Sequence, residues 1–158
     1  MANRYIPVYR VALVRESTLI GAYGKCFLPA TTAAMIHDFI GDSDDREHFG
    51  EVLLDAKHNV IGILSVATGT LSACIVSPAN VLKPVIIQNA VIHNVSAIIL
   101  WHNHPSGDCE PSQEDIKITQ RICEAAQLFD VKVLDHIIVG TGLDRKRNHI
   151  SFHERDLL

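Results

Sequence analysis

The chain has 158 residues, of which 47% are hydrophobic and 20% are charged, and its formal net charge at pH 7 is −4. This length is enough for one domain with a sizeable core, and the composition is that of an ordinary globular protein. The acidic balance gives no general electrostatic reason to bind nucleic acid, and no signal peptide or membrane-spanning run is recognisable, so the cytoplasm is the expected location.

The first part of the chain predicts a strand, a turn and a helix. Residues 5–14 are rich in apolar and β-branched side chains, which favours a strand, and a turn is expected at 21–24. Apolar residues then recur at helical spacing as far as Gly41, which ends the helix. Either Thr31 or Thr32 is expected to cap this helix, because a threonine hydroxyl can accept from the first backbone N–H groups.

A hairpin is predicted next. Residues 42–45 are acidic, and a solvated loop is favoured there over a second cation site. Residues 47–55 predict a strand, and residues 59–67 predict its antiparallel partner, with a turn between them. A further short strand is expected at 71–76, after a Gly-Thr break.

The middle of the chain predicts a helix followed by a buried strand. Ser77 and Pro78 form a typical helix start, with serine as the cap and proline at the first helical position. Pro84 lies inside this helix and is expected to kink or interrupt it. Residues 95–101 are apolar and predict a buried strand that leads directly into two histidines.

The last third predicts a helix and two strands. In the helix at residues 112–129, the side chains expected to face inward are spaced at i, i+4, i+7 and i+11, namely Ile118, Ile122, Ala125 and Phe129. Strands are expected at 131–139 and 149–152, and the basic cluster at 145–147 is expected to be a solvated loop tip. Strands and helices interleave without strict alternation. The sequence therefore predicts an α/β fold, a single three-layer domain with a mixed sheet flanked by helices.

A candidate metal site lies where the buried strand ends. His102 and His104 are two residues apart and therefore project to the same side of that strand. A Pro-Ser-Gly turn follows, and Asp115 is expected one turn inside the next helix, on its inward face. Two imidazoles and a carboxylate are typical of a metal site that leaves a position for water. The alternative is structural, because Ser112 and Asp115 also form a helix-capping pattern.

The full pattern resembles the JAMM motif of JAB/MPN-domain metalloproteases. It reads H-x-H-x(7)-S-x(2)-D, from His102 to Asp115. The longer strings H-N-H-P-S-G-D, P-S-x-x-D and L-D-H-I-I-V-G are similar to the RadC branch of that group. The resemblance runs from about Tyr5 to the C-terminus and implies a cytidine-deaminase-like JAB/MPN fold. We expect one such domain over residues 1–158, with its core at about 5–155 and without the N-terminal helix-hairpin-helix region of longer RadC relatives.

The resemblance also implies a catalytic arrangement. His102, His104 and Asp115 would bind Zn²⁺, with water as the fourth ligand, and neutral histidine and aspartate are side chains that suit zinc. Glu47, just before an apolar strand, matches the family's proton shuttle, and Glu51 is its rival. Ser112 would hold the tetrahedral oxygen. These roles predict a zinc-dependent metallopeptidase or isopeptidase that acts on a peptide or protein substrate.

Two other functions remain as alternatives. RadC relatives are associated with DNA repair, so one is a metal-containing genome-maintenance factor without peptidase activity. The other is a non-catalytic MPN scaffold, although scaffold members of that fold usually lose the ligands that are present here. Cys109 is expected to be an exposed loop thiol in preference to a ligand. His136 is expected to be a hydrogen-bonded core histidine, with a role in orienting a ligand as the second choice.

Overall fold

The structure is a computed structural model, and it describes residues 14–20, 28–41, 45–69, 76–91, 95–142, 144 and 146–158. Within these residues, three helices pack against one five-stranded sheet. The strand expected at 5–14, the turn at 21–24 and the strand at 71–76 fall wholly or almost wholly outside the described residues. No helix in the described part of the chain has the length and apolar character of a membrane span.

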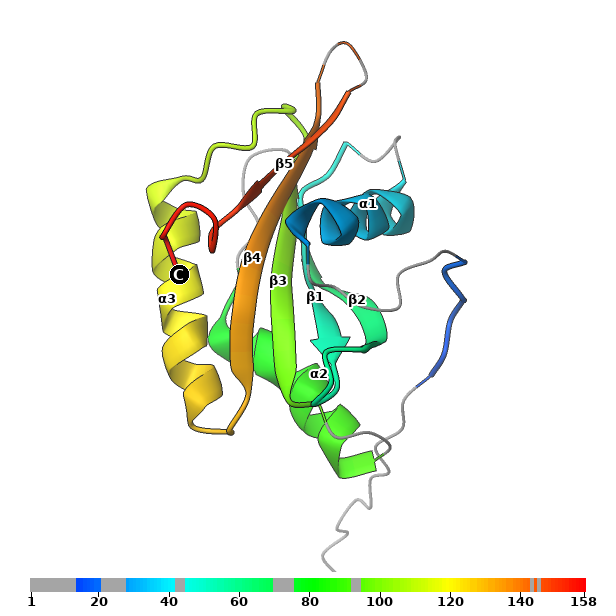
Figure 1. Ribbon diagram of the computed structural model, residues 1–158, viewed down its shortest axis with the longest axis vertical. Coiled ribbons are helices and arrows are strands. Elements are labelled where there is room, and N and C mark those ends of the chain that lie inside the picture. The colour runs from blue at the N-terminus through cyan, green and yellow to red at the C-terminus, as the bar shows by residue number, and fades with distance from the viewer. Residues whose placement is uncertain are drawn as a thin grey trace, which may run out of the picture.

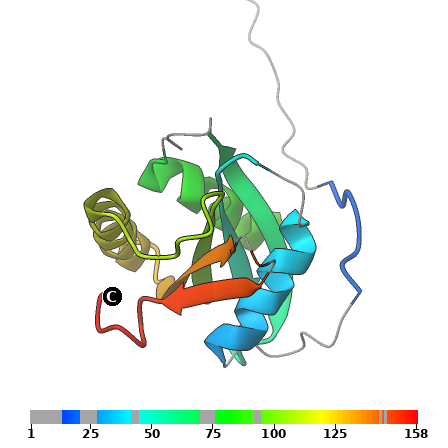
Figure 2. The ribbon, with the colours of Figure 1, turned by 90° about the horizontal axis from the view of Figure 1, so that it is seen from above.

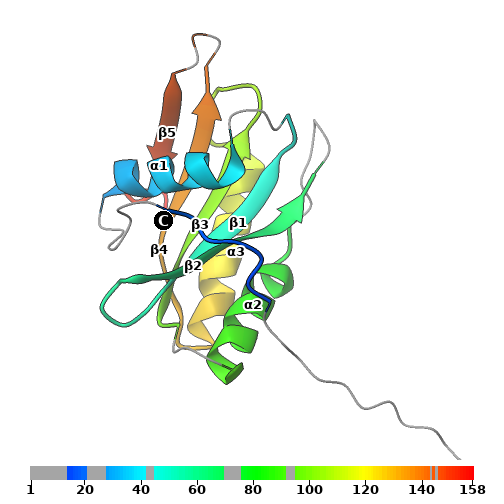
Figure 3. The ribbon, with the colours of Figure 1, turned by 90° about the vertical axis from the view of Figure 1, so that its right-hand side faces the viewer.

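The sheet is mixed and has the strand order β2-β1-β3-β4-β5. Neighbouring strands are antiparallel except for β3 and β4, which are parallel. Helix α1 covers one face of the sheet, and α2 and α3 cover the other (Figures 1 and 3), an arrangement that Figure 2 shows from above. The expected three-layer α/β fold is thereby confirmed. The elements are β1 (His48–Leu54), β2 (Val60–Thr68), β3 (Ala97–His104), β4 (Lys132–Thr141), β5 (Arg147–Ser151), α1 (Pro29–Ile40), α2 (Pro78–Val91) and α3 (Gln113–Gln127).

Side-chain alternation along β3 divides the apolar interior into two cores. Ile99 and Trp101 belong to the core beneath α1, whereas Ile98 and Leu100 belong to the core beneath α2 and α3. All four side chains are buried, which explains why this strand reads as a continuous apolar run. The same alternation places His102 on the α3 face of the sheet.

The structure corrects three expectations about the helices. Helix α1 begins at Pro29, and its N-cap is Leu28, which makes no side-chain cap; neither threonine caps it. Proline has no N–H that would need a hydrogen-bond partner in the first turn, and its fixed φ already suits a helix. Helix α2 continues through Pro84 without interruption. Phe129 is 49% exposed because α3 ends two residues earlier, at Gln127.

A glutamate is buried in the core beneath α2 and α3. Glu51 lies in the middle of β1, opposite Leu64 and Leu100, and its side chain is 0% exposed. Neither carboxyl oxygen has a hydrogen-bond partner among the residues that the structure describes. Burial raises the pKa of Glu51 from 4.5 to about 9. The side chain therefore carries a proton at neutral pH, because a charge without a partner is costly inside a protein.

Glu51→Gln is expected to change how stability depends on pH. The unfolded chain loses the Glu51 proton above pH 4.5 whereas the folded chain keeps it to about pH 9, so Glu51 lowers stability progressively across that interval. At about 1.4 kcal/mol per pH unit, the variant should gain roughly 3 kcal/mol on the parent between pH 4.5 and pH 7. Urea unfolding of both proteins at several pH values measures this. If the free energies of unfolding of the two proteins changed in parallel with pH, the prediction would be contradicted. Burying the glutamine amide adds the same cost at every pH, so it does not affect this comparison.

Candidate metal centre

Three potential ligands converge where β3 ends and α3 begins. The Nε2 atoms of His102 and His104 are 2.9 Å apart. Asp115 Oδ1 is 3.4 Å from Nε2 of His102, and Asp115 Oδ2 is 3.8 Å from Nε2 of His104. Among the described residues, these three form the group of His, Cys, Asp and Glu side chains that could hold a metal ion. The three residues expected from the sequence therefore do lie together.

A tight loop carries the chain from the histidines to the helix. Gly107 has φ +82°, and a Cβ atom there would lie 2.6 Å from the carbonyl oxygen of Thr141. Only glycine fits both the backbone conformation and this approach. The Gly107 N–H also donates to the carbonyl of His104, at 2.9 Å, which closes the turn. This loop returns the chain over the ends of β3 and β4 so that α3 starts beside the imidazoles.

The capping pattern is present and coexists with the ligand cluster. The hydroxyl of Ser112 accepts from Asp115 N–H at 3.1 Å and donates to Asp115 Oδ2 at 2.7 Å. Asp115 Oδ2 also accepts from the Ser112 N–H at 2.7 Å. These bonds fix the carboxylate by one oxygen and leave Oδ1 facing His102. The helix start thus orients a candidate ligand as well as satisfying backbone groups.

The environment of His102 favours the neutral imidazole that binds metals. Burial lowers the pKa of His102 to about 4, although Asp115 acts in the opposite direction. Nδ1 of His104 lies 2.6 Å from the carbonyl oxygen of Asp108, which can only accept, so Nδ1 carries the hydrogen and the lone pair of the neutral ring is on Nε2. The cluster is therefore rich in acceptors, and a bound cation would satisfy them.

The charges of two cluster residues reach Glu47, whereas burial alone acts on Glu51. Glu47 is half-buried immediately before β1. Burial raises its pKa, with a lowering contribution from the charge of His104 and a raising one from Asp115, so it is within electrostatic range of both. The pKa of Glu51 is raised by burial alone. Of the two candidates for the shuttle, only Glu47 interacts electrostatically with the centre.

Asn103, which lies between the two histidines, has a function that the sequence analysis missed. Its Oδ1 accepts from the His48 N–H at 2.7 Å, and its Nδ2 donates to the carbonyl of Arg46 at 2.9 Å. The amide thus holds the backbone on both sides of Glu47. From strand alternation alone, Asn103 could be predicted to lie on the opposite face from the histidines. Its contact with the segment around Glu47 could not be predicted in this way.

Three further residues behind the centre are buried. Nε2 of His136 lies 2.8 Å from Nδ1 of His102. His136 is thus the hydrogen-bonded core histidine that was expected, and its partner is one of the candidate ligands. Its other nitrogen contacts Thr119 at 2.6 Å. Asp135 accepts from Ser151 and from the His136 and His153 N–H groups, which ties the C-terminal segment to β4. No motif in the sequence indicated a role for Thr119 or Asp135.

Cys109 is buried, and the expectation of an exposed loop thiol was wrong. Its side chain packs against Gly140, where an added Cβ would lie 2.9 Å from Sγ. The loop returns over the end of β4, so the thiol enters a small apolar cluster with Ile138 and Phe152. Burial, helped by the charges of Asp108 and Glu110, raises its pKa to about 11. A thiol of this kind is a poor metal ligand, and it is not in the cluster.

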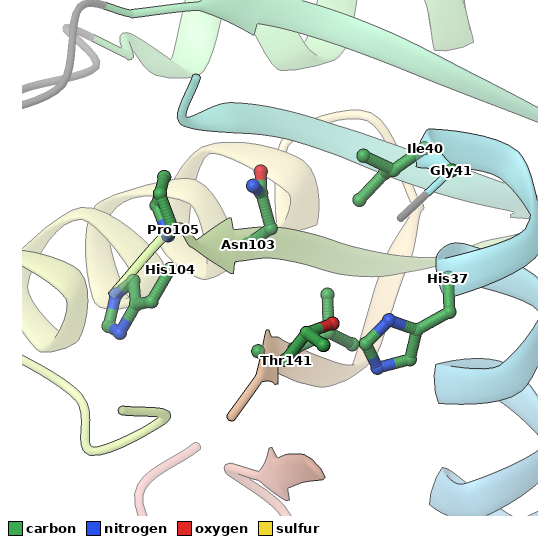
Figure 4. A pocket seen from close by; sticks show the side chains of 9 residues that line it. His37, Ile40, Gly41, Asn103, His104, Pro105 and Thr141 are labelled. Carbon is green, nitrogen blue, oxygen red and sulfur yellow. The ribbon is translucent and has the colours of Figure 1, made fainter. Parts of the chain in front are cut away.

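A small pocket adjoins the centre. It has a volume of about 170 Å³ and lies between the end of α1 and the ends of the parallel strands β3 and β4. Figure 4 shows His37 and Ile40 on the helix side, and Asn103, His104 and Thr141 on the strand side. Ligands of α/β proteins commonly bind beyond the carboxyl ends of parallel strands. The pocket provides room for part of a ligand beside His104.

Comparison with known proteins connects this arrangement to one family. The RadC-like JAB domain family matches residues 28–157. A UPF0758 protein of Desulfitobacterium hafniense is 43% identical over 114 residues, which are 72% of this chain and 46% of the relative. UPF0758 proteins of Rubrobacter xylanophilus and Azotobacter vinelandii are 45% identical over 105 residues and 48% identical over 99 residues. The matches cover 66% and 63% of this chain. The chain thus spans less than half the length of these relatives, at 46%, 44% and 42%.

The cluster is expected to bind one divalent metal ion per chain. Replacement of His102, His104 or Asp115 by alanine should remove most of the bound metal, because two ligands hold an ion much less well than three. Elemental analysis of the purified proteins measures this. Cys109→Ala serves as a control and should retain the metal. Full metal content in the Asp115 variant would show that the carboxylate is not a ligand.

Proposed function

Because this chain belongs to the RadC-like JAB domain family, we propose that it is a zinc-dependent metallopeptidase or isopeptidase that hydrolyses an amide bond with an activated water. One observation carries the proposal, namely that His102, His104 and Asp115 converge within electrostatic range of Glu47. Three protein ligands are the number found at catalytic zinc sites, which keep one position for water. A purely structural zinc site would normally supply four.

The ligand set supports zinc. Two neutral imidazoles and one carboxylate are borderline ligands, whereas Mg²⁺ and Ca²⁺ prefer oxygen atoms alone. Zinc bound by these residues would polarise the carbonyl of the substrate and lower the pKa of its bound water to about 7. His104 and Asp115 are 19% and 16% exposed, so a substrate can approach from their side. His102, which is 1% exposed, would hold the ion from the core side.

Glu47 would transfer the proton. A carboxylate whose pKa is raised toward neutrality accepts a proton from water and later releases it to the departing amine. The bonds from Asn103 to the backbone of Arg46 and His48 hold Glu47 in position for both steps. Such positioning matters because proton transfer requires hydrogen-bond distance to the reacting atoms.

Ser112 would stabilise the tetrahedral oxygen. In the structure its hydroxyl hydrogen is donated to Asp115 Oδ2. To serve the substrate, this hydroxyl must rotate, and Asp115 Oδ2 then still keeps the bond from the Ser112 N–H. A donor aimed at the developing oxyanion contributes more to the transition state than to the bound substrate. The pocket beside His104 would take a neighbouring part of the peptide or protein substrate.

Glu47→Gln is expected to abolish most hydrolysis while leaving the metal bound. Glutamine keeps the size of the side chain but cannot accept a proton, so the rate should fall by about 10²–10⁴-fold. The measurement is hydrolysis of a peptide or isopeptide substrate found by screening, together with metal content. Glu51→Gln is the matched control, because it makes the same change four residues away in the core, and it should stay within a few-fold of the parent.

Two results would contradict this assignment in different ways. If the Glu51→Gln protein were inactive and the Glu47→Gln protein had normal activity, the proton shuttle would be Glu51, and its assignment to Glu47 would be wrong. Activity that depends on zinc but on neither glutamate would remove the proposed mechanism altogether. A protein that binds zinc but hydrolyses none of the peptide and isopeptide substrates would favour a genome-maintenance factor or an MPN scaffold.

Binding to DNA is expected to be weak and strongly dependent on salt. The net charge is −4, and two residues of the basic cluster form ion pairs, Lys146 with Asp144 at 3.1 Å and Arg147 with Asp38 at 2.8 Å. Two of the three cations in this cluster are thus already paired, which weakens contacts to phosphates. Fluorescence anisotropy with duplex and branched DNA over a range of salt concentrations tests this. Tight binding at physiological salt would support the genome-maintenance alternative.

A further inference from the structure

A line of buried polar groups connects two of the candidate ligands behind the metal centre. It runs from Nδ1 of His102 to Nε2 of His136, at 2.8 Å, and from Nδ1 of His136 to Oγ1 of Thr119, at 2.6 Å. Oγ1 of Thr119 then contacts the backbone carbonyl of Asp115, also at 2.6 Å. His136 and Thr119 are 0% exposed, so this line is sealed from solvent. Its two ends belong to the first and third ligands.

The chemistry of the groups gives this line one direction. The Asp115 carbonyl can only accept, so the hydrogen between it and Thr119 is the threonine's own. Thr119 then has no hydrogen left for His136, and Nδ1 of His136 must donate to the hydroxyl. A second proton on His136 would bury a charge between Phe49 and Phe152, whose rings pack on the imidazole. Nε2 of His136 therefore accepts, and Nδ1 of His102 donates to it.

We propose that His136 and Thr119 are positioning residues that hold His102 in the tautomer with hydrogen on Nδ1, which presents its Nε2 lone pair to the metal. The inference rests on the proposed function, because it concerns the same metal centre. Neither residue would contact the ion or the substrate. Their effect reaches the centre only through the ring of His102.

The opposite direction fails at one identifiable contact. If Nε2 of His102 carried the hydrogen and donated it to His104, Nδ1 of His102 would have to accept from His136. His136 would in turn need the hydrogen of Thr119. Two oxygen atoms, of Thr119 and Asp115, would then face each other at 2.6 Å with no hydrogen between them. Such a contact is repulsive with or without a metal. The proposed direction instead leaves two bare nitrogen atoms, Nε2 of His102 and of His104, 2.9 Å apart, and a cation bound between them satisfies both. The threonine therefore decides the tautomer.

The tautomer of His104, with hydrogen on Nδ1, is fixed by a single contact. Its Nδ1 donates directly to the carbonyl of Asp108. His102 has no carbonyl in that position and depends on two intermediate side chains. The spacing of Asp115 and Thr119 explains why the line can close, because residues i and i+4 are neighbours on one helix face. The helix that supplies the third ligand thus also orients the first.

Nitrogen NMR of the metal-free protein tests the tautomer directly. A ring nitrogen that bears hydrogen resonates far from one that does not, so long-range ¹H–¹⁵N spectra of the whole chain report both rings. We expect hydrogen on Nδ1 and none on Nε2 in both His102 and His136. Hydrogen on Nε2 of His102 would overturn the inference, whatever the protein's activity.

Thr119→Val tests the consequence for metal binding. Valine keeps the branched shape but cannot accept from His136, which should then move its hydrogen to Nε2 and reverse the tautomer of His102. Competition with a chromophoric chelator should show Zn²⁺ affinity lower by about 10–100-fold. Thr119→Ser keeps the hydroxyl and should restore the parent affinity and spectrum. Thr32→Val is the matched control, because it removes a buried threonine hydroxyl from α1 on the other face.

The outcomes separate the inference from the proposed function. Parent affinity and parent tautomers in a folded Thr119→Val protein would overturn the inference while zinc binding and hydrolysis stood. A parent protein that binds no Zn²⁺ would overturn the proposed function, and the ring spectra would still decide the tautomer. If Thr119→Val does not fold, His136→Gln and His136→Leu take its place. The glutamine oxygen can accept from His102 and should preserve affinity, whereas leucine should lose it.

Discussion

The alternation of side chains along β3 is the constraint on which the rest of the site depends. Ile99 and Trp101 are buried beneath α1, whereas Leu100 is buried beneath α2 and α3, on the face that also receives His102. A shift of one residue in the strand pairing would exchange the two faces and bury the imidazoles beneath α1. Because both faces carry large apolar side chains, such a shift is strongly disfavoured. Core packing therefore holds the ligands in register.

The centre is fully buried on one side and partly exposed to solvent on the other. Behind it, His136 and Thr119 are fully buried, and each of their polar side-chain atoms has a partner. A buried polar network is stable only when all its members are satisfied, and it is then rigid, because the loss of one leaves the others unpaired. In front, His104 and Asp115 remain partly exposed. A rigid support and an accessible face are what a catalytic metal site requires.

Two glutamates four residues apart show how much the environment changes one side chain. Glu47 precedes β1, and the charges of His104 and Asp115 reach it. Glu51 lies within β1, where the core removes water without supplying a partner among the described residues. The first environment suits proton transfer, whereas the second lowers stability at neutral pH. Sequence resemblance preferred Glu47, but the residues themselves could not separate the two, because both are acids next to apolar residues.

The sequence by itself determined most of the secondary structure and the sides on which the candidate ligands lie. Periodicity and capping are local, so they could be read for β3 and α3, although α1 begins at Pro29 without the expected threonine cap. Only the tertiary structure decided which distant side chains meet. His136 reaches His102 across 34 residues because β4 pairs in parallel with β3, and Asn103 reaches His48 across 55 because β1 begins beside it. Such neighbours depend on how strands pair and pack over the whole chain, which no local pattern contains.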